Sequence, residues 1–288
     1  MKKFFKRIFQ LIAENLSLGE IRRQLEAERE AAISDYLQRH LFGGEKYALS
    51  KKLNRYERQV YSQGGEDGIL QEIFRRIGQT NNFFVEFGAG AGLENNTIFL
   101  LARGWNGCWL EGSGRNIKSL EKTFGFLVDQ KRLKIKKALV AAENVEQLFG
   151  DLAVPTEPDL LSIDIDGNDY WVWRAIKNYH PRVVAIEYNS LWPPDFSWVM
   201  KYNPSNRWQG DSYFGASLKS LEELGRQKGY KLVGCSFAGT NAFFVRDDLV
   251  ANHFQEPFTA ANHYEPKRKF LLRRPLGDKR SFGEFENI

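Results

Sequence analysis

A glycine-rich segment, Val85-Glu86-Phe87-Gly88-Ala89-Gly90-Ala91-Gly92, most constrains how this chain can fold. The apolar run 82–87 that leads into it predicts a short buried strand, and residues 92–103 after it predict a helix with an apolar side. Glycine is needed where a Cβ would block the close approach of the backbone or where φ must be positive. A strand, a glycine turn and a helix together bring backbone N–H groups close to a ligand.

A second predicted strand, residues 107–111, follows the helix and ends in Glu111. A carboxylate at the tip of the second parallel strand can accept hydrogen bonds from both hydroxyls of a ribose. The glycine spacing does not fit the dinucleotide fingerprint G-x-G-x-x-G, because Leu93 stands at the position of its third glycine. The spacing is instead E-x-G-x-G-x-G and begins with Glu86. A glycine turn without a ligand is the alternative, and Glu111 argues against it.

Predicted strands and helices alternate from residue 61 onward. The expected strands are 82–87, 107–111, 133–140, 159–165, 183–188, 231–237 and 241–245, and the expected helices are 62–77, 92–103, 115–127, 144–149, 169–179 and 213–228. Such alternation predicts a parallel sheet covered by helices on both faces. The short connection 238–240 favours a hairpin between the last two strands. We therefore expect an α/β, doubly wound, mostly parallel seven-stranded sheet with a C-terminal antiparallel hairpin.

The chain divides into three parts by composition and pattern. Residues 1–60 are expected to form a basic, helical N-terminal extension with a helix over 17–42, residues 61–250 the α/β domain, and residues 251–288 a basic tail. A length of 288 residues with 42% hydrophobic content is enough for one large domain with a well-buried core.

The net charge of +5 lies at the two ends of the chain. Residues 1–60 carry 13 Lys and Arg against 8 Asp and Glu, and residues 265–288 carry 7 against 4. The middle of the chain, 61–264, is acidic, with 21 against 24. This distribution predicts that the domain itself does not bind nucleic acid.

The N-terminal sequence MKKFFKRIFQLIAENL is basic and amphipathic. It lacks the apolar core and cleavage site of a signal peptide. Two interpretations stay open, a helix packed on the domain or on a partner, and peripheral contact with an anionic membrane through the basic termini. Cys108 and Cys235 both lie in predicted strands, which indicates core residues in a reducing, cytoplasmic compartment.

Three acids crowd the end of the fourth predicted strand, namely Asp164, Asp166 and Asp169. Crowded carboxylates raise one another's pKa unless a cation or a donor neutralises them. One hypothesis is a divalent metal such as Mg²⁺ held by these three oxygen donors. A second is that Asp164 or Asp166 is a catalytic general base. The third is that Asp166 and Asp169 only cap the following helix and Asp164 alone touches a ligand.

The chain resembles the FkbM-like branch of S-adenosylmethionine-dependent methyltransferases, with the class I methyltransferase fold. The resemblance covers about residues 60–247. The segments that carry it are 61–68, 84–92, 95–97, 104–112, 142–144, 161–171 and 186–189.

This resemblance implies S-adenosylmethionine as cofactor and assigns roles to individual residues. Glu86 would lie near the methionine end of the cofactor, and Glu111 would hold the ribose hydroxyls. Gly88, Gly90 and Gly92 would let the backbone approach. The remaining residues implied to bind the cofactor are Gln63 and Glu66 ahead of the first strand, Ala142 and Glu143 beside the adenine, and Asp164 near the transferred methyl.

The segment 189–211 is the expected substrate lid, because it is long and rich in aromatic residues. Its rings suit either stacking on a sugar or a small core of their own. The function that we expect is O-methylation of a hydroxyl on a glycan or a small secondary-metabolite acceptor. A non-catalytic or nucleotide-binding module of the same fold is the alternative, and a nicotinamide-dependent oxidoreductase is less favoured because of Leu93.

Overall fold

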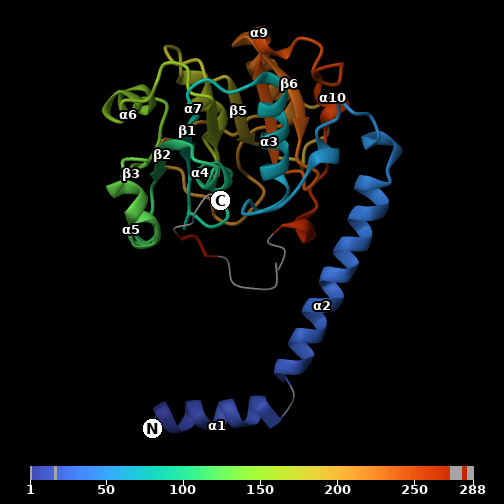
Figure 1. The fold of residues 1–288 in the computed structure, drawn as a ribbon, viewed down its shortest axis with the longest axis vertical. Coiled ribbons are helices and arrows are strands. Elements are labelled where there is room, and N and C mark those ends of the chain that lie inside the picture. The colour runs from blue at the N-terminus through green and yellow to red at the C-terminus, as the bar shows by residue number, and fades with distance from the viewer. Residues whose placement is uncertain (1, 16–17, 273–280, 284–288) are drawn as a thin grey trace.

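The computed structural model describes residues 2–15, 18–272 and 281–283 (Figure 1). One sheet with helices on both of its faces forms the body of the molecule. Two N-terminal helices stand away from that body.

Seven strands form the sheet in the order β3-β2-β1-β4-β5-β7-β6. Their bounds are β1 Phe83–Phe87, β2 Asn106–Glu111, β3 Leu133–Lys137, β4 Leu160–Ile163, β5 Val183–Glu187, β6 Tyr230–Cys235 and β7 Asn241–Arg246. The first five strands pair in parallel, whereas β7 pairs antiparallel with both β5 and β6. The expected doubly wound sheet with a closing hairpin, a fold of the class I methyltransferase type, is therefore confirmed.

Side chains of β1 alternate between two hydrophobic cores, one on each face of the sheet. Val85 and Phe87 point to the core that also contains residues of α6, α7 and α8, and Phe84 points to the core shared with α3, α4 and α5. Cys108 and Cys235 are free, buried thiols in strands, as expected. The helices of the body are α3 Glu66–Ile77, α4 Ile98–Ala102, α5 Gly114–Asp129, α6 Val145–Asp151, α7 Asp169–Ala175, α8 Leu218–Gln227, α9 Asp247–Val250 and α10 Ala260–His263.

Several elements are shorter than the sequence predicts, because polar side chains take up backbone donors at their ends. The helix expected at 92–103 is reduced to α4, and residues 92–97 form turns. The helix expected at 213–228 begins only at Leu218, where the Ser217 side chain caps it by accepting from the Ser220 N–H. The strand expected at 159–165 ends at Ile163, so Asp164 and Asp166 lie in the turn that follows it.

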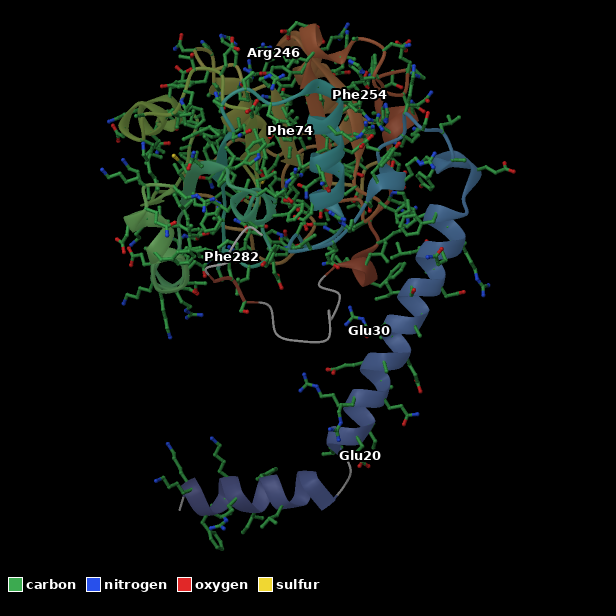
Figure 2. The ribbon with its side chains drawn as sticks, viewed as in Figure 1. Glu20, Glu30, Phe74, Arg246, Phe254 and Phe282 are labelled. Atoms are coloured by element: carbon green, nitrogen blue, oxygen red, sulfur yellow. The ribbon has the colours of Figure 1, made fainter. Side chains whose placement is uncertain are left out.

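The N-terminal extension consists of α1 Lys2–Asn15 and α2 Leu18–Leu37, followed by the π-helical turn η1 Gln38–Phe42. Only the C-terminal end of α2 meets the body, where Ile33 and Leu37 join a small core with Phe237 and Leu271. Figure 2 shows the side chains of Glu20 and Glu30 on the part of α2 that projects beyond the body. Within the described ranges, no helix has both the length and the apolar character needed to cross a bilayer.

Residues on both sides of the predicted 61–250 domain pack onto it. Leu53, in the segment before the domain, and Phe254, in the segment after it, are fully buried in the same core as Phe243. Asn54 also donates a hydrogen bond to the Cys235 carbonyl at 2.7 Å. The described part of the tail, 251–272, is thus integral to the body.

Candidate functional site

A cavity of about 1620 Å³ lies at the carboxyl ends of the parallel strands. The residues after β1, β2, β3, β4 and β5 all contribute to its wall. Strand order reverses between β1 and β4, and this is where open α/β sheets bind ligands. Pockets for a single small ligand occupy roughly 300–1,000 Å³. The cavity therefore has room for two ligands side by side.

The three glycines of the turn after β1 all have positive φ, but each meets a different neighbour. A Cβ on Gly88 would lie 1.7 Å from the Asp164 carbonyl oxygen, and one on Gly92 would lie 2.5 Å from the Phe124 ring. A Cβ on Gly90 would meet nothing within 4 Å. Gly88 and Gly90 line the cavity. Gly90 therefore opens its backbone to a ligand, whereas Gly88 and Gly92 are needed for packing.

Glu111, at the end of β2, lies directly beside this turn. Its Oε2 accepts from the Gly90 N–H at 2.8 Å, and its Oε1 accepts from the Ser113 N–H at 2.6 Å. The side chain is buried but lines the cavity. Each carboxylate oxygen can accept more than one hydrogen bond, so two acceptor positions remain for a diol.

Glu86 stabilises the loop that replaces the first turns of the predicted helix. It accepts hydrogen bonds from the Asn95 side chain, the Asn96 backbone N–H, the Thr97 hydroxyl and the Ser162 hydroxyl. Burial raises the pKa of Glu86 to about 7, against the effect of these hydrogen bonds. Because these donors surround it, Glu86 acts first as an anchor for residues 95–97, although it also lines the cavity.

Gln63 and Glu66, which precede the sheet, have different positions. Gln63 lines the cavity, whereas Glu66 is fully buried behind it. Glu66 accepts from the Gly64 N–H at 2.9 Å and from the side chains of Thr240 and Asn241 at 3.3 Å. Thr240 and Asn241 belong to the cavity wall, so Glu66 positions this wall from the rear.

Ala142 and Glu143 do not line the cavity. The Ala142 N–H donates to the Tyr202 hydroxyl at 3.2 Å, and this hydroxyl donates to Glu143. Residues 137–140, just before them, form the wall at this point. The role of Ala142 and Glu143 beside the adenine stays a prediction.

An acidic cluster lies across the cavity from Glu111. Carboxylate oxygens of Asp164, Asp166 and Glu187 lie within 4.8 Å of one another. Glu187 ends β5, the strand beside β4, and its Oε2 is buried without a hydrogen-bond partner. Oxygen donors at this separation can share a proton or hold a divalent cation.

Asp169 does not belong to this cluster, in contrast to the predicted metal site. Its two carboxylate oxygens accept from the Ile165 N–H and the Gly167 N–H, both at 2.9 Å. These bonds hold the turn in which Asp166 has a φ of 54°, a left-handed conformation that is strained for a residue other than glycine. Asp169 thus holds the turn that contains Asp166. It does not cap the helix as the third hypothesis expects, because the N-cap of α7 is Asn168, which makes no side-chain cap hydrogen bond.

Burial and mutual repulsion favour the protonated forms of the cluster. Burial raises the pKa of Asp164 well above its usual range, and the charges of Asp166 and Asp169 raise it further. Burial likewise raises the pKa of Glu187, with Asp164 as the largest charge contribution. The Lys267 ammonium opposes the shift at Glu187 and at Asp166.

The predicted lid is divided between a small aromatic core and the cavity. Trp192 stacks on Phe196 and on Trp198, with ring centroids 5.2 and 5.1 Å apart. Trp208 and its neighbour Arg207 line the cavity instead. The interpretation as a small aromatic core therefore holds for Trp192, Phe196 and Trp198, whereas stacking on a sugar stays a prediction for Trp208.

The sequence prediction omitted Glu187 and Lys267 from the site. Glu187 ends a parallel strand just as Glu111 does, so its position at the strand tip was a usable signal. Lys267 lies in the tail and reaches the cavity only because residues 251–272 fold back over the sheet. Lys269 reaches the cavity in the same way, whereas Arg29 comes from α2 in the N-terminal extension.

No protein-family model and no curated protein matches this sequence. Among solved structures, the chain is similar to the pyocyanin biosynthetic protein PhzM, at 13% identity over 74% of this chain and 61% of that chain, with a TM-score of 0.39. A Staphylococcus aureus protein, provisionally assigned as a caffeoyl-CoA O-methyltransferase, matches at 13% identity over 76% of this chain and 99% of that chain, with a TM-score of 0.45. An O-methyltransferase from Bacillus cereus, solved with S-adenosylhomocysteine, matches at 15% identity over 61% of this chain and 76% of that chain, with a TM-score of 0.38. These scores are low, so the fold assignment rests on strand order and register.

Proposed function

We propose that this protein is an S-adenosylmethionine-dependent methyltransferase of the FkbM-like type. The observation that carries the proposal is the contact between the Glu111 carboxylate and the Gly90 N–H. It places a carboxylate that can accept hydrogen bonds from a diol next to a stretch of backbone that a ligand can approach, within one cavity. S-adenosylmethionine needs both groups: its ribose would bind Glu111, and its sulfonium arm would lie along the glycine turn.

The second half of the cavity suits a hydroxylated acceptor. Methyl transfer needs the acceptor oxygen in line with the sulfonium carbon, and it needs a base for the hydroxyl proton. As the oxygen–carbon bond forms and the carbon–sulfur bond breaks, the proton passes to a carboxylate. We assign this role to Asp164, which has a raised pKa and lies where β4 meets the glycine turn.

A glycan or a polar small molecule is the acceptor class that best fits the outer wall. Trp208 offers a ring for stacking on an apolar sugar face. Arg29, Arg207, Lys267 and Lys269 surround the same part of the cavity. Their side chains can donate hydrogen bonds to hydroxyl or acidic groups of the acceptor.

A divalent metal ion such as Mg²⁺ is a second candidate for the acidic cluster. The partnerless Oε2 of Glu187 and the short separations to Asp164 and Asp166 favour it. The three residues would hold the ion, which would supply Lewis acidity toward an acceptor hydroxyl. If chelation leaves turnover unchanged and added Mg²⁺ does not raise it, the base assignment stands without metal.

Calorimetric titration with S-adenosylhomocysteine, with NAD in parallel, tests the cofactor assignment. We expect binding of S-adenosylhomocysteine alone. Glu111→Ala should weaken it by about 10- to 100-fold, because two hydrogen bonds to a charged group are lost. Glu121→Ala, which removes an exposed acid from α5, should not change it.

The thermal melting curve of each variant shows whether the fold is intact. Equal affinity of folded Glu111→Ala and wild type would overturn the ribose assignment. Binding of NAD alone would indicate an oxidoreductase, and binding of neither would favour a module without this cofactor.

A further inference from the structure

The first helix of the chain, α1, has one basic side and one apolar side. Successive helical residues are 100° apart, so residues three and four apart share a face. The basic residues are Lys2, Lys3, Lys6 and Arg7, and the apolar residues opposite them are Phe4, Phe5, Ile8, Phe9 and Leu11. Residues 2–13 contain no acid. Two chemically distinct sides thus run along one short helix.

The apolar side of α1 is open to solvent. The exposed fractions are 66% for Phe4, 59% for Phe5, 72% for Phe9 and 52% for Leu11. Large aromatic side chains gathered on one exposed face indicate an interaction surface. Figures 1 and 2 show that α2 holds α1 away from the body, so the α/β domain does not cover this face.

We propose that α1 docks this protein on an anionic lipid bilayer. The aromatic side would enter the boundary between headgroups and acyl chains, and the four cations would meet lipid phosphates. A helix of 14 residues is about 21 Å long, which is too short to span the hydrocarbon core but suits a position in the interface.

Charge favours lipid over a second copy of the chain as the occupant. Two α1 helices packed through their apolar sides would leave the four cations of each copy without a counter-charge, because residues 2–13 of the partner copy contain no acid either. An anionic headgroup layer supplies the opposite charge along the whole helix. Arg29, on the helix that carries α1, also lines the cavity, so docking would hold the cavity wall near the bilayer.

Co-sedimentation of the full chain with vesicles tests the proposal without cofactor or acceptor, so the result does not depend on the proposed function. Phosphatidylcholine vesicles with phosphatidylglycerol should bind the protein, and vesicles of phosphatidylcholine alone should bind it much less. Binding should weaken as salt rises. The double variant Lys2→Gln/Lys6→Gln should bind about fivefold more weakly for each charge removed.

Each α1 variant has a matched control variant in the body, one for the lysines and one for the leucine. Lys118→Gln/Lys122→Gln removes two exposed lysines with the same spacing from α5 and should leave binding unchanged. Leu11→Ser should weaken binding about tenfold. Leu49→Ser, which changes a leucine of the same 52% exposure on the body, should have no effect.

Two results would overturn the proposal. One is binding that is equal on neutral and anionic vesicles, or that is unaffected by the α1 variants. The other is the absence of vesicle binding together with a concentration-dependent dimer that Leu11→Ser dissociates, since α1 would then serve contact between copies.

Discussion

Acids at the tips of neighbouring strands have different roles that depend on what surrounds them. Glu86 on β1 accepts hydrogen bonds from four donors of the protein itself. Glu111 on β2 accepts only two, so it keeps acceptor positions open to the cavity. Asp164 and Glu187, after β4 and on β5, lie beside each other without such donors. The number of hydrogen-bond donors around each carboxylate therefore distinguishes the anchor Glu86 from the acids to which the proposed function assigns ligand binding and proton transfer.

The variant Asp166→Asn, which removes one charge beside Asp164, tests the assignment of Asp164 as the base. The negative charge of Asp166 raises the pKa of Asp164, so its removal should lower that pKa. The ionised base then forms at lower pH, and the rise of kcat/KM with pH should move toward acid. Asp164→Asn should abolish turnover. If Asp166→Asn abolishes it instead while Asp164→Asn does not, the base is Asp166.

At the scale of elements, the turn after β1 combines a packing requirement with a ligand surface. Gly88 allows β1 and β4 to lie close together, and Gly90 keeps the surface of the turn clear. The loop 92–97 replaces helix because Glu86 accepts hydrogen bonds from its donors, so α4 keeps only residues 98–102 of the predicted 92–103 helix. The hydrogen bonds to one buried carboxylate thus override a strong local helix pattern.

Substitution of the turn glycines should separate folding from cofactor binding. Gly90→Ala should fold with a loss of about 1–2 kcal/mol, the cost of a left-handed alanine, but its methyl group would face the cofactor and weaken S-adenosylhomocysteine binding. Gly88→Ala should lose more than about 3 kcal/mol, because its Cβ collides with the Asp164 carbonyl. Urea unfolding and calorimetric titration measure the two effects.

Gly125→Ala is the control for this pair. Gly125 lies inside α5, where an added Cβ would meet nothing within 4 Å, so alanine should stabilise the protein by about 0.5–1 kcal/mol. A Gly88→Ala protein as stable as wild type would contradict the packing role of that glycine.

At the scale of the whole molecule, the segments before and after the α/β domain meet at Glu265. Its buried carboxylate forms ion pairs with Lys46 at 2.7 Å and Arg268 at 2.9 Å, and it accepts from the Tyr47 hydroxyl. Tyr188, just after β5, donates to the Glu265 carbonyl. This junction ties residues 45–47 and the tail to the sheet.

Glu265→Ala should destabilise the protein by about 1–3 kcal/mol, because the buried Tyr47 hydroxyl loses its acceptor and Arg268 loses its counter-charge, whereas the half-exposed Lys46 regains water. Denaturant unfolding measures the change. Glu223→Ala, which removes the exposed partner of Lys219, should cost less than about 1 kcal/mol. A loss of that smaller size for Glu265→Ala would mean that the tail is not held to the body through this residue.

The sequence by itself determined the strand-and-helix order, the hairpin, the glycine turn and the acid at the tip of β2, because these depend on local periodicity and on glycine spacing. It also indicated the amphipathic character of residues 2–15. Element ends were predicted less well, since side chains such as Ser217 and Glu86 compete for backbone donors there.

Only the tertiary structure decided how the acids are shared among roles. The acidic cluster contains Glu187 in place of the predicted Asp169. Asp169 accepts hydrogen bonds from backbone N–H groups, whereas β5 brings Glu187 beside Asp164. Lys267 and Lys269 reach the cavity because the tail folds back onto the body, and Arg29 reaches it from α2. Contacts between residues far apart in sequence leave no local pattern, and so they become visible only when the chain is folded.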